Sequence, residues 1–357
     1  MKNSLRNLKR STGVAAAFLG ASALVLTGCG AAPEAGGGSA APEVDYTACM
    51  VSDEGGFDDR SFNQASHEGL TQARTDLGVK INQAESNAGT DMKPNIESMV
   101  SAGCDIIVTA GFLIGDATLE AAEKYPDTKF AIVDYGYEEN PANLRTLNYK
   151  TDEAAFLAGY AAAAYSKSGK VGTFGGAEIP TVTIFMDGFL NGVNHFNEVK
   201  GADVQVVGWG SSKSFVGNFS DAGKARQLSD NMLAEGVDVI MPVAGPLGQA
   251  AVDAVNESSS ADDTVVWVDT DGFDYANNGQ DVVLTSVMKE MGKTVEESIK
   301  LGLDDTFTND AYMGTLENGG VSIAPFHNFA DKVPAELQGE IDQLKQDIID
   351  GTVSVGS

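Results

Sequence analysis

Short apolar runs alternate with longer amphipathic stretches along the chain from residue 45 onwards. Apolar runs of about four to eight residues are typical of buried strands, and a period of about 3.6 residues is typical of helices. The strand cores at 106–108 and 130–133 are apolar throughout, which indicates parallel strands covered on both faces. The first series predicts strands over 46–51, 79–83, 105–109, 129–134 and 144–149, with helices over 64–77, 92–102, 116–124 and 153–166.

A second series with the same alternation begins at residue 169. It predicts strands over 170–174, 203–209, 238–243, 264–269 and 282–288, with helices over 184–197, 222–234, 249–257, 294–302 and 334–350. Residues 312–315 and 320–323 predict a hairpin near the end of the chain. The whole chain therefore has the pattern of an α/β protein.

A short internal repeat relates the two series. Residues 103–115 read G-C-D-I-I-V-T-A-G-F-L-I-G, and residues 236–248 read G-V-D-V-I-M-P-V-A-G-P-L-G. The segments share Gly, Asp, Ile and the final Gly at identical offsets, although short matches also arise from composition alone. We interpret the repeat as two lobes of one topology, each a doubly wound parallel sheet, with a central cleft between them.

Polar and aromatic residues gather where the predicted strands end. Open α/β sheets bind ligands outside the carboxyl ends of their strands, so this clustering predicts a ligand site in the cleft. In the first lobe the positions hold Asp53, Phe62, Asn63, Gly111, Phe112, Asp134 and Tyr135. In the second lobe they hold Trp209, Gly245–Gly248, Asp269, Asp271 and Lys289.

The residue types at these positions favour a ligand with an aromatic ring and hydroxyl groups. Phe62 offers a flat face for stacking, and the carboxylates and Asn63 offer hydrogen bonds. Each residue also has a plainer explanation: Phe62 would suit an apolar core, and Asp53 or Asp269 would suit a helix cap. Lys289 would suit a surface ion pair with Glu290, Glu296 or Glu297.

Five segments together resemble the basic membrane protein family of lipoproteins, the PnrA-like nucleoside-binding proteins of ABC transporters. They are S-D-E-G-G-F-D-D-R-S-F-N from Ser52, T-A-G-F-L-I-G from Thr109, Y-P-D-T-K-F-A-I-V-D from Tyr125, W-V-D-T-D-G from Trp267 and L-T-S-V-M-K from Leu284. The resemblance implies a type I periplasmic-binding-protein fold, with crossings between lobes near residues 150, 285 and 312. The N-terminal lobe would then comprise 45–149 plus 286–312, and the C-terminal lobe 150–285 plus 313–357.

The resemblance also implies a function and a set of ligand contacts. The protein would capture nucleosides, with a purine favoured, and deliver them to the permease subunits of an ABC transporter. The implied contacts are Asp53, Phe62, Asn63, Asp134, Gly245, Lys289, and either Asp269 or Asp271 for the ribose hydroxyls. A second aromatic side chain would sandwich the base, with Trp209, Phe174, Phe185 and Phe215 as the candidates.

The N-terminus has the pattern of a targeting segment. Residues 1–28 combine a basic start with an apolar stretch over 14–26, and they end in L-T-G before Cys29. This ending resembles the lipobox of bacterial lipoproteins, which implies that Cys29 becomes the lipidated (palmitoylated) N-terminus; an ordinary signal peptide is the alternative. Residues 29–44 would form a flexible tether. We therefore expect a protein anchored by lipid alone to the extracytoplasmic face of the cell membrane.

The charge balance limits the kinds of partner and ligand that the protein is expected to bind. The formal net charge is −28. Removal of residues 1–28 leaves 19 basic against 51 acidic residues, a net charge of −32. Such a chain repels nucleic acid and anionic membranes, and it favours a neutral or cationic ligand. We expect no nucleic-acid partner, no cofactor and a monomer.

An enzyme is the main rival to a binding protein. The sequence contains no G-x-S-x-G, P-loop or H-E-x-x-H motif, so catalysis is not expected, and a metal-dependent nucleoside hydrolase is the remaining enzymatic alternative. A sugar-binding or signalling receptor on the same fold is a further alternative. The offset between Cys49 and Cys104 along neighbouring strands predicts two buried thiols in place of a disulfide.

Overall fold

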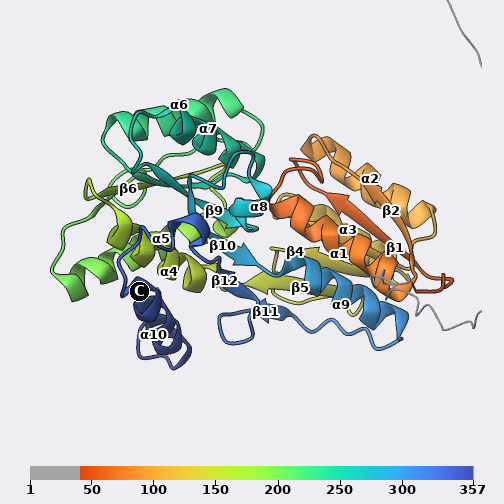
Figure 1. Cartoon of the computed structure of the whole chain (residues 1–357). Helices are drawn as coiled ribbons and strands as arrows, with labels where there is room; N and C mark the ends of the chain where they lie inside the picture. Colours follow the sequence, from red (N-terminus) through yellow and green to blue (C-terminus); the bar gives the residue numbers. More distant parts are fainter. Residues whose placement is uncertain (1–40, 357) are drawn as a thin grey trace, which may run out of the picture. The chain divides into compact units, whose positions relative to one another are not determined.

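Two six-stranded sheets organise residues 41–356, the part of the chain that the computed structural model describes (Figure 1). The predicted signal peptide, the lipidation site at Cys29 and most of the predicted tether lie outside these residues. Each sheet carries helices on its faces, which confirms the predicted α/β class with two doubly wound lobes.

The first lobe is built on a sheet with the strand order β11-β5-β4-β3-β1-β2, in which all neighbouring strands are parallel. Alternate side chains along β1 and β3 enter two different apolar clusters, one with α1 and α9 and one with α2 and α3. The strands are β1 (Thr47–Ser52), β2 (Lys80–Ala84), β3 (Ile106–Ala110), β4 (Lys129–Val133), β5 (Leu144–Tyr149) and β11 (Tyr312–Gly314). The helices are α1 (Phe62–Leu77), α2 (Gly89–Ser101), α3 (Gly115–Lys124) and α9 (Met291–Leu303).

The second lobe repeats this plan with the strand order β12-β10-β9-β8-β6-β7, and only the β10–β12 pair is antiparallel within the sheet. The strands are β6 (Lys170–Gly175), β7 (Gln205–Val207), β8 (Val239–Val243), β9 (Thr264–Asp269), β10 (Val283–Lys289) and β12 (Val321–Ile323). The helices are α4 (Thr151–Tyr165), α5 (Pro180–Lys200), α6 (Ala222–Ala234), α7 (Gln249–Glu257), α8 (Gly272–Tyr275) and α10 (Leu337–Ile349), with 3₁₀ turns η1 (Gly245–Gly248) and η2 (His327–Phe329).

The predicted internal repeat corresponds to equivalent places in the two sheets. Strands β3 and β8, which begin the repeated segments, both lie fourth in their strand orders. Strands β4 and β9, the next strands along the chain after the repeated segments, both lie third. The interpretation of the repeat as two lobes of one topology is therefore confirmed.

The chain passes between the two sheets three times. It leaves the first sheet after Tyr149, returns after Lys289, and crosses again between β11 and β12. The predicted hairpin at 312–323 is wrong, because β11 pairs with β5 and β12 pairs with β10 in the other sheet. A turn over residues 316–319 joins these strands, but the connection spans two sheets and supplies an edge strand to each.

The expectation of two free thiols is also wrong. Cys49 and Cys104 form a disulfide with a Cα–Cα distance of 5.9 Å. Cys104 does not extend β3: it belongs to the turn that ends α2, where its N–H donates to the carbonyl of Met99. Gly103 has a φ of 80° in this turn, and the chain folds over the sheet face that Cys49 points to.

Candidate functional site

A cavity lies between the lobes, at the carboxyl ends of strands from both sheets. The empty space within it is about 540 Å³, including its opening to solvent. Most of the residues predicted from the sequence line it: Asp53, Phe62, Asn63, Asp134, Gly245, Asp269 and Lys289. Its position confirms the expectation that ligand-type side chains converge where strands of the two lobes end.

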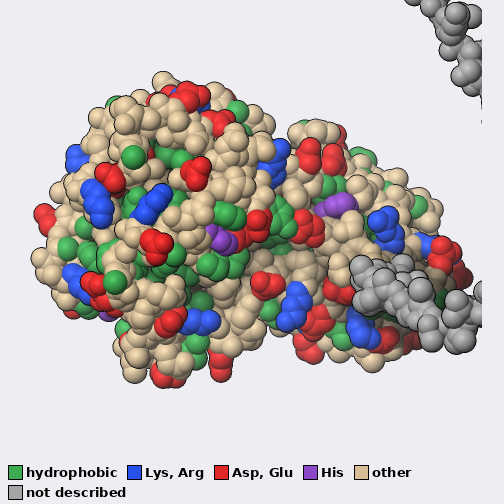
Figure 2. Space-filling view, in the orientation of Figure 1, with side chains coloured by type: hydrophobic (Ala, Val, Ile, Leu, Met, Phe, Trp, Pro, Cys, Tyr) green, Lys and Arg blue, Asp and Glu red, His purple; other side chains and the backbone are tan. Residues whose placement is uncertain are grey.

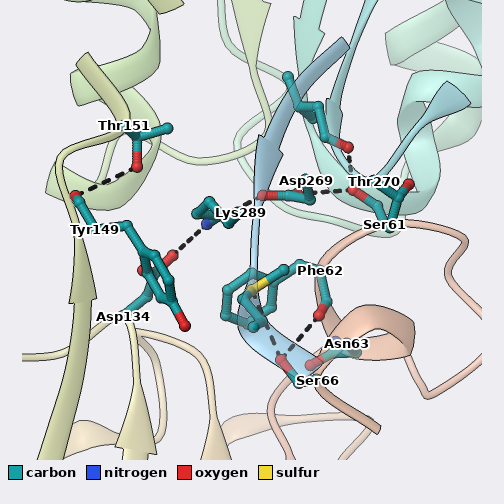
Figure 3. Close-up of polar contacts among 12 residues, drawn as sticks. Ser61, Phe62, Asn63, Ser66, Asp134, Tyr149, Thr151, Asp269, Thr270 and Lys289 are labelled. Carbon is teal, nitrogen blue, oxygen red and sulfur yellow. Dashed lines mark hydrogen bonds and ion pairs between the residues drawn. The ribbon is translucent and has the colours of Figure 1, made fainter. Parts of the chain in front are cut away.

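Lys289 lines this cavity and joins the two lobes by contacts with Asp134 and Asp269 (Figure 3). Its Nζ lies 2.6 Å from Oδ2 of Asp134 and 3.0 Å from Oδ1 of Asp269. All three side chains are less than a tenth exposed. The ammonium offsets the charge of the two buried carboxylates, and its removal would leave both of them without a counter-charge.

The backbone aims the two carboxylates. Asp134 directly follows β4 with a φ of 61°, and Asp269 ends β9 with a φ of 72°. Residues other than glycine seldom adopt a positive φ, and the strained positions at which they do so concentrate at functional sites. Here the turn of the backbone directs both side chains off the ends of their strands toward Lys289.

Burial and ion pairing have opposite effects on the pKa values of Asp134 and Lys289 in this cluster. Burial raises the pKa of the Asp134 carboxyl above its ordinary value, and the Lys289 ammonium opposes part of that rise. Burial alone would lower the pKa of Lys289, but Asp134 and Asp269 outweigh it and hold that pKa above its ordinary value. The lysine is therefore charged at neutral pH.

Ser61 is a member of the cluster that sequence reasoning missed. This fully buried hydroxyl donates to Oδ2 of Asp269 at 2.7 Å and lies 3.2 Å from the carbonyl oxygen of Val268. Ser61 directly precedes α1 in the first lobe, whereas Asp269 belongs to the second. The S-F-N triplet at 61–63 was the available signal, but only Phe62 and Asn63 were selected from it.

Aromatic rings from both lobes surround the charged cluster. The Lys289 Nζ lies 4.7 Å from the ring centroid of Phe62 in the first lobe and 5.1 Å from that of Phe185 on α5. Of the four candidates for a second stacking ring, Phe185 alone lines the cavity. Phe174 lies in a separate apolar cluster, and Trp209 packs edge-on against Phe215. Phe112, which the sequence analysis placed at a strand end of the first lobe, and Phe219, which it did not select, line the cavity as well.

Asp53 and Asn63 form a second polar group in the cavity. Asn63 is 1% exposed, and its Nδ2 donates to the carbonyl of Glu54 at 3.2 Å, while its Oδ1 has no hydrogen-bond partner among the described residues. Burial raises the pKa of Asp53 to about 8, although hydrogen bonds from Leu113 N–H and Asn63 oppose the rise. At pH 7 the Asp53 carboxyl is therefore mainly protonated and able to donate.

Asp59, also missed at the sequence level, holds the start of α1 in place. Its carboxylate accepts the backbone N–H groups of Ser61, Asn63 and Gln64 at 2.9, 2.9 and 3.0 Å. Burial raises its pKa to about 6, against the lowering effect of these hydrogen bonds. The helix start that presents Phe62 and Asn63 thus depends on a buried acid.

Asp271 lies outside the cavity lining, although the sequence left it equal with Asp269. Its Oδ1 accepts the N–H of Phe273 at 3.1 Å and so caps α8, and its Oδ2 lies 2.7 Å from Nε2 of His327. Of the two aspartates in the D-x-D segment, Asp269 is the one that lines the cavity.

The cavity carries far more acid than base. Its lining includes the carboxyl groups of Asp53, Glu54, Asp59, Asp134 and Asp269, with Lys289 as the basic residue. Acidic side chains are also spread over both lobes on the face that Figure 2 shows.

Within residues 41–356 no group of three or more His, Cys, Asp and Glu side chains is arranged to hold a metal ion. The same residues contain no helix of the length and apolar character needed to cross a membrane.

Comparison with known proteins agrees with this geometry. Residues 46–357 match the family described as ABC transporter substrate-binding protein PnrA-like. The ABC transporter nucleoside-binding protein BmpA of Lactococcus lactis subsp. cremoris is 32% identical, over 98% of this chain and 99% of its own. Basic membrane protein A of Borreliella burgdorferi is 30% identical, over 90% of this chain and 91% of its own. A solved ABC transporter solute-binding protein of Aeropyrum pernix K1 has a TM-score of 0.76 at 23% identity, covering 87% of this chain and 92% of that one.

Proposed function

Because the chain belongs to the PnrA-like family of ABC transporter substrate-binding proteins, we propose that it captures nucleosides between its lobes and delivers them to an ABC permease. The family consists of extracytoplasmic substrate-binding proteins and not of enzymes, in agreement with the expectation of a binding protein. One relative, at 32% identity, is itself named a nucleoside-binding protein.

The observation that carries the proposal is the Asp134–Lys289–Asp269 cluster with phenylalanine rings around it. A ribose presents adjacent hydroxyl groups, and ionised carboxylates accept hydrogen bonds from hydroxyls more strongly than neutral groups do. Asp134 and Asp269 come from opposite lobes and point to one place, so a ribose there would be held from both sides. The Lys289 ammonium would lie between the two carboxyl groups in the closed cleft and offset their negative charge.

The base would lie against the phenylalanine rings. Stacking of a base on an aromatic side chain contributes about 1–3 kcal/mol. Phe62 and Phe185 supply faces from opposite lobes, and Asp53 as donor with Asn63 Oδ1 as acceptor would meet the polar edge of the base. We favour a purine because its two fused rings cover more of this apolar surface than one ring does.

The excess of carboxyl groups argues against a phosphorylated ligand. A nucleotide brings at least one further negative charge into a cavity where a single lysine already faces two carboxylates. Burial of an unpaired charge is costly. We therefore propose that the protein takes nucleosides and rejects nucleoside monophosphates.

The mode of attachment is proposed from the sequence. We propose that Cys29 carries the lipid and that residues 29–44 form the tether. The Cys49–Cys104 disulfide supports an extracytoplasmic location, because disulfides persist in oxidising compartments. We keep the predicted lobe boundaries as part of the proposal. The N-terminal lobe comprises 45–149 plus 286–312, and the C-terminal lobe comprises 150–285 plus 313–357.

The test is a thermal-shift panel of purine and pyrimidine nucleosides, their monophosphates, free bases, ribose and other sugars. A ligand at about 100 times its dissociation constant stabilises a protein by about 2.7 kcal/mol. We expect stabilisation by nucleosides, largest for purines, and none by monophosphates. A response to sugars alone would favour the sugar-receptor alternative, and hydrolysis of a nucleoside to its base would favour the hydrolase. Silence toward every nucleoside, in folded protein freed of bound ligand, would contradict the proposal.

A further inference from the structure

We propose that a clasp outside the cavity, formed by Arg60 and Glu68 of the first lobe with Thr270 and Tyr275 of the second, holds the lobes closed and slows ligand release. The claim that the clasp slows ligand release rests on the proposed function, whereas the claim that it holds the lobes closed does not. The clasp joins the start of α1 to the segment that runs from the end of β9 into α8, two regions that lie side by side in Figure 1.

The clasp has two polar contacts. The Tyr275 hydroxyl lies 2.8 Å from Oε2 of Glu68 and 3.0 Å from its Oε1. The Thr270 hydroxyl donates to the backbone carbonyl of Arg60 at 2.9 Å. Burial raises the pKa of Tyr275 to about 12, so its hydroxyl keeps its proton and donates to the carboxylate at neutral pH.

Both halves of the clasp are held in position by their own lobe. On the first lobe, Gln64 Nε2 donates to Oε1 of Glu68 at 3.1 Å. On the second lobe, the indole Nε1 of Trp267 donates to Thr270 Oγ1 at 3.1 Å. The short helix α8 that carries Tyr275 is capped by Asp271. Such fixed partners lose little conformational entropy when the lobes meet, which makes the contact more favourable.

A second aromatic contact supports α8. His327 stacks on Phe273 with ring centroids 4.2 Å apart and an interplanar angle of 15°, and the same imidazole bonds to Asp271. The sequence leaves Asp269 and Asp271 as alternatives for the ribose, and in the structure Asp271 has this supporting role for α8. The D-x-D segment thus separates two tasks: Asp269 faces the cavity and Asp271 fixes the helix that carries the clasp tyrosine.

The position of the clasp makes its effect independent of ligand contacts. None of its four residues lines the cavity. It can therefore form whether or not a ligand is bound, and its loss changes the balance between closed and open lobes without altering a group that touches the ligand. A ligand that needs the closed conformation then dissociates faster, because the competent state is less populated.

The test compares Tyr275→Phe with Tyr160→Phe. Tyr160 donates to Oε2 of Glu340 at 2.8 Å within the second lobe, so its variant loses the same kind of bond without affecting lobe closure. We expect Tyr275→Phe, in ligand-free solution, to raise the radius of gyration measured by X-ray scattering, while Tyr160→Phe matches the wild type. With the nucleoside identified by the panel, stopped-flow dissociation should be about tenfold faster in Tyr275→Phe alone, the scale of one hydrogen bond to a charged group.

The scattering result decides the proposal even when no nucleoside binds. Circular dichroism and thermal unfolding first establish that both variants fold. A ligand-free radius of gyration in Tyr275→Phe equal to that of the wild type overturns the clasp, and so does an equal increase in Tyr160→Phe. Failure of every nucleoside to bind, together with a larger radius in Tyr275→Phe only, would overturn the proposed ligand and leave the clasp supported.

Discussion

Asp134 and Asp269 occupy equivalent places in the two lobes and meet at the same ammonium. One follows β4 and the other ends β9, the third strands of their sheets, and both have positive φ. Their carboxylates lie 2.6 and 3.0 Å from the Nζ of Lys289. The internal repeat of the fold is thereby also a repeat of the site, with one ligand-type carboxylate contributed by each lobe.

Replacement of Lys289 by methionine should destabilise the protein by about 3–5 kcal/mol, because it leaves two buried carboxylates without their counter-charge. Urea unfolding at pH 7 measures this change. Lys293→Met is the matched control, since Lys293 is exposed on α9 and should cost little. Equal unfolding free energies for the two variants would contradict the role assigned to Lys289.

Asp269→Asn should weaken nucleoside binding by about ten- to a hundredfold, because the charge-assisted hydrogen bonds to the ligand are lost. Asp271→Asn makes the same chemical change two residues later, at a side chain outside the cavity lining. Isothermal titration calorimetry on both variants distinguishes the two aspartates. A larger loss of affinity in Asp271→Asn would return the ribose contact to that residue.

Asp53 should make the unfolding free energy depend on pH. Its pKa in the folded protein is about 8, above the ordinary 3.8, so the folded state binds more protons than the unfolded state between these values. The stability that its protonated form contributes is complete below about pH 4 and is lost as the pH rises through about 8. Asp53→Asn removes this loss, so its stability relative to the wild type should grow from pH 5 to pH 8. A difference between the two proteins that stays constant over this range would show that Asp53 titrates normally.

Gly111→Ala should lower both stability and ligand affinity. Gly111 has a φ of 114°, and a Cβ there would overlap the Asp53 carboxyl group. Gly103→Ala is the control for backbone strain alone, since Gly103 has a φ of 80° and an added Cβ meets nothing within 4 Å. Both variants should lose about 1 kcal/mol from strain, but only Gly111→Ala should weaken binding. Unchanged affinity in Gly111→Ala would mean that the position of Asp53 does not matter to the ligand.

Reduction of the Cys49–Cys104 disulfide should destabilise the protein by about 4 kcal/mol, the loop-closure value for its sequence separation of 55. Thermal unfolding with and without dithiothreitol measures the effect. The Cys49→Ala/Cys104→Ala double variant should resemble the reduced protein and should not respond to the reductant. A response in the double variant would show that the reductant acts elsewhere.

Much of the fold followed from local patterns. Apolar runs located the strands, and 3.6-residue periods located the helices, to within a few residues in most cases. The repeat that begins at Gly103 and Gly236 was sufficient to predict two lobes of one topology. Most of the candidate site residues could also be selected, because strand ends are recognisable in the sequence and open sheets place ligands there.

The sequence by itself thus determined the elements, the repeated topology and the kind of residues at the cleft. The tertiary structure decided which of them meet: Asp269 and not Asp271, Phe185 among four aromatics, Ser61 and Asp59 as unpredicted members, and the Cys49–Cys104 disulfide. It also assigned β11 and β12 to different sheets. Periodicity reports only which face of its own element a side chain occupies. Whether residues 61 and 269 touch depends on how the two separate sheets are placed relative to each other. A local sequence pattern contains no information about the distance between residues on different sheets.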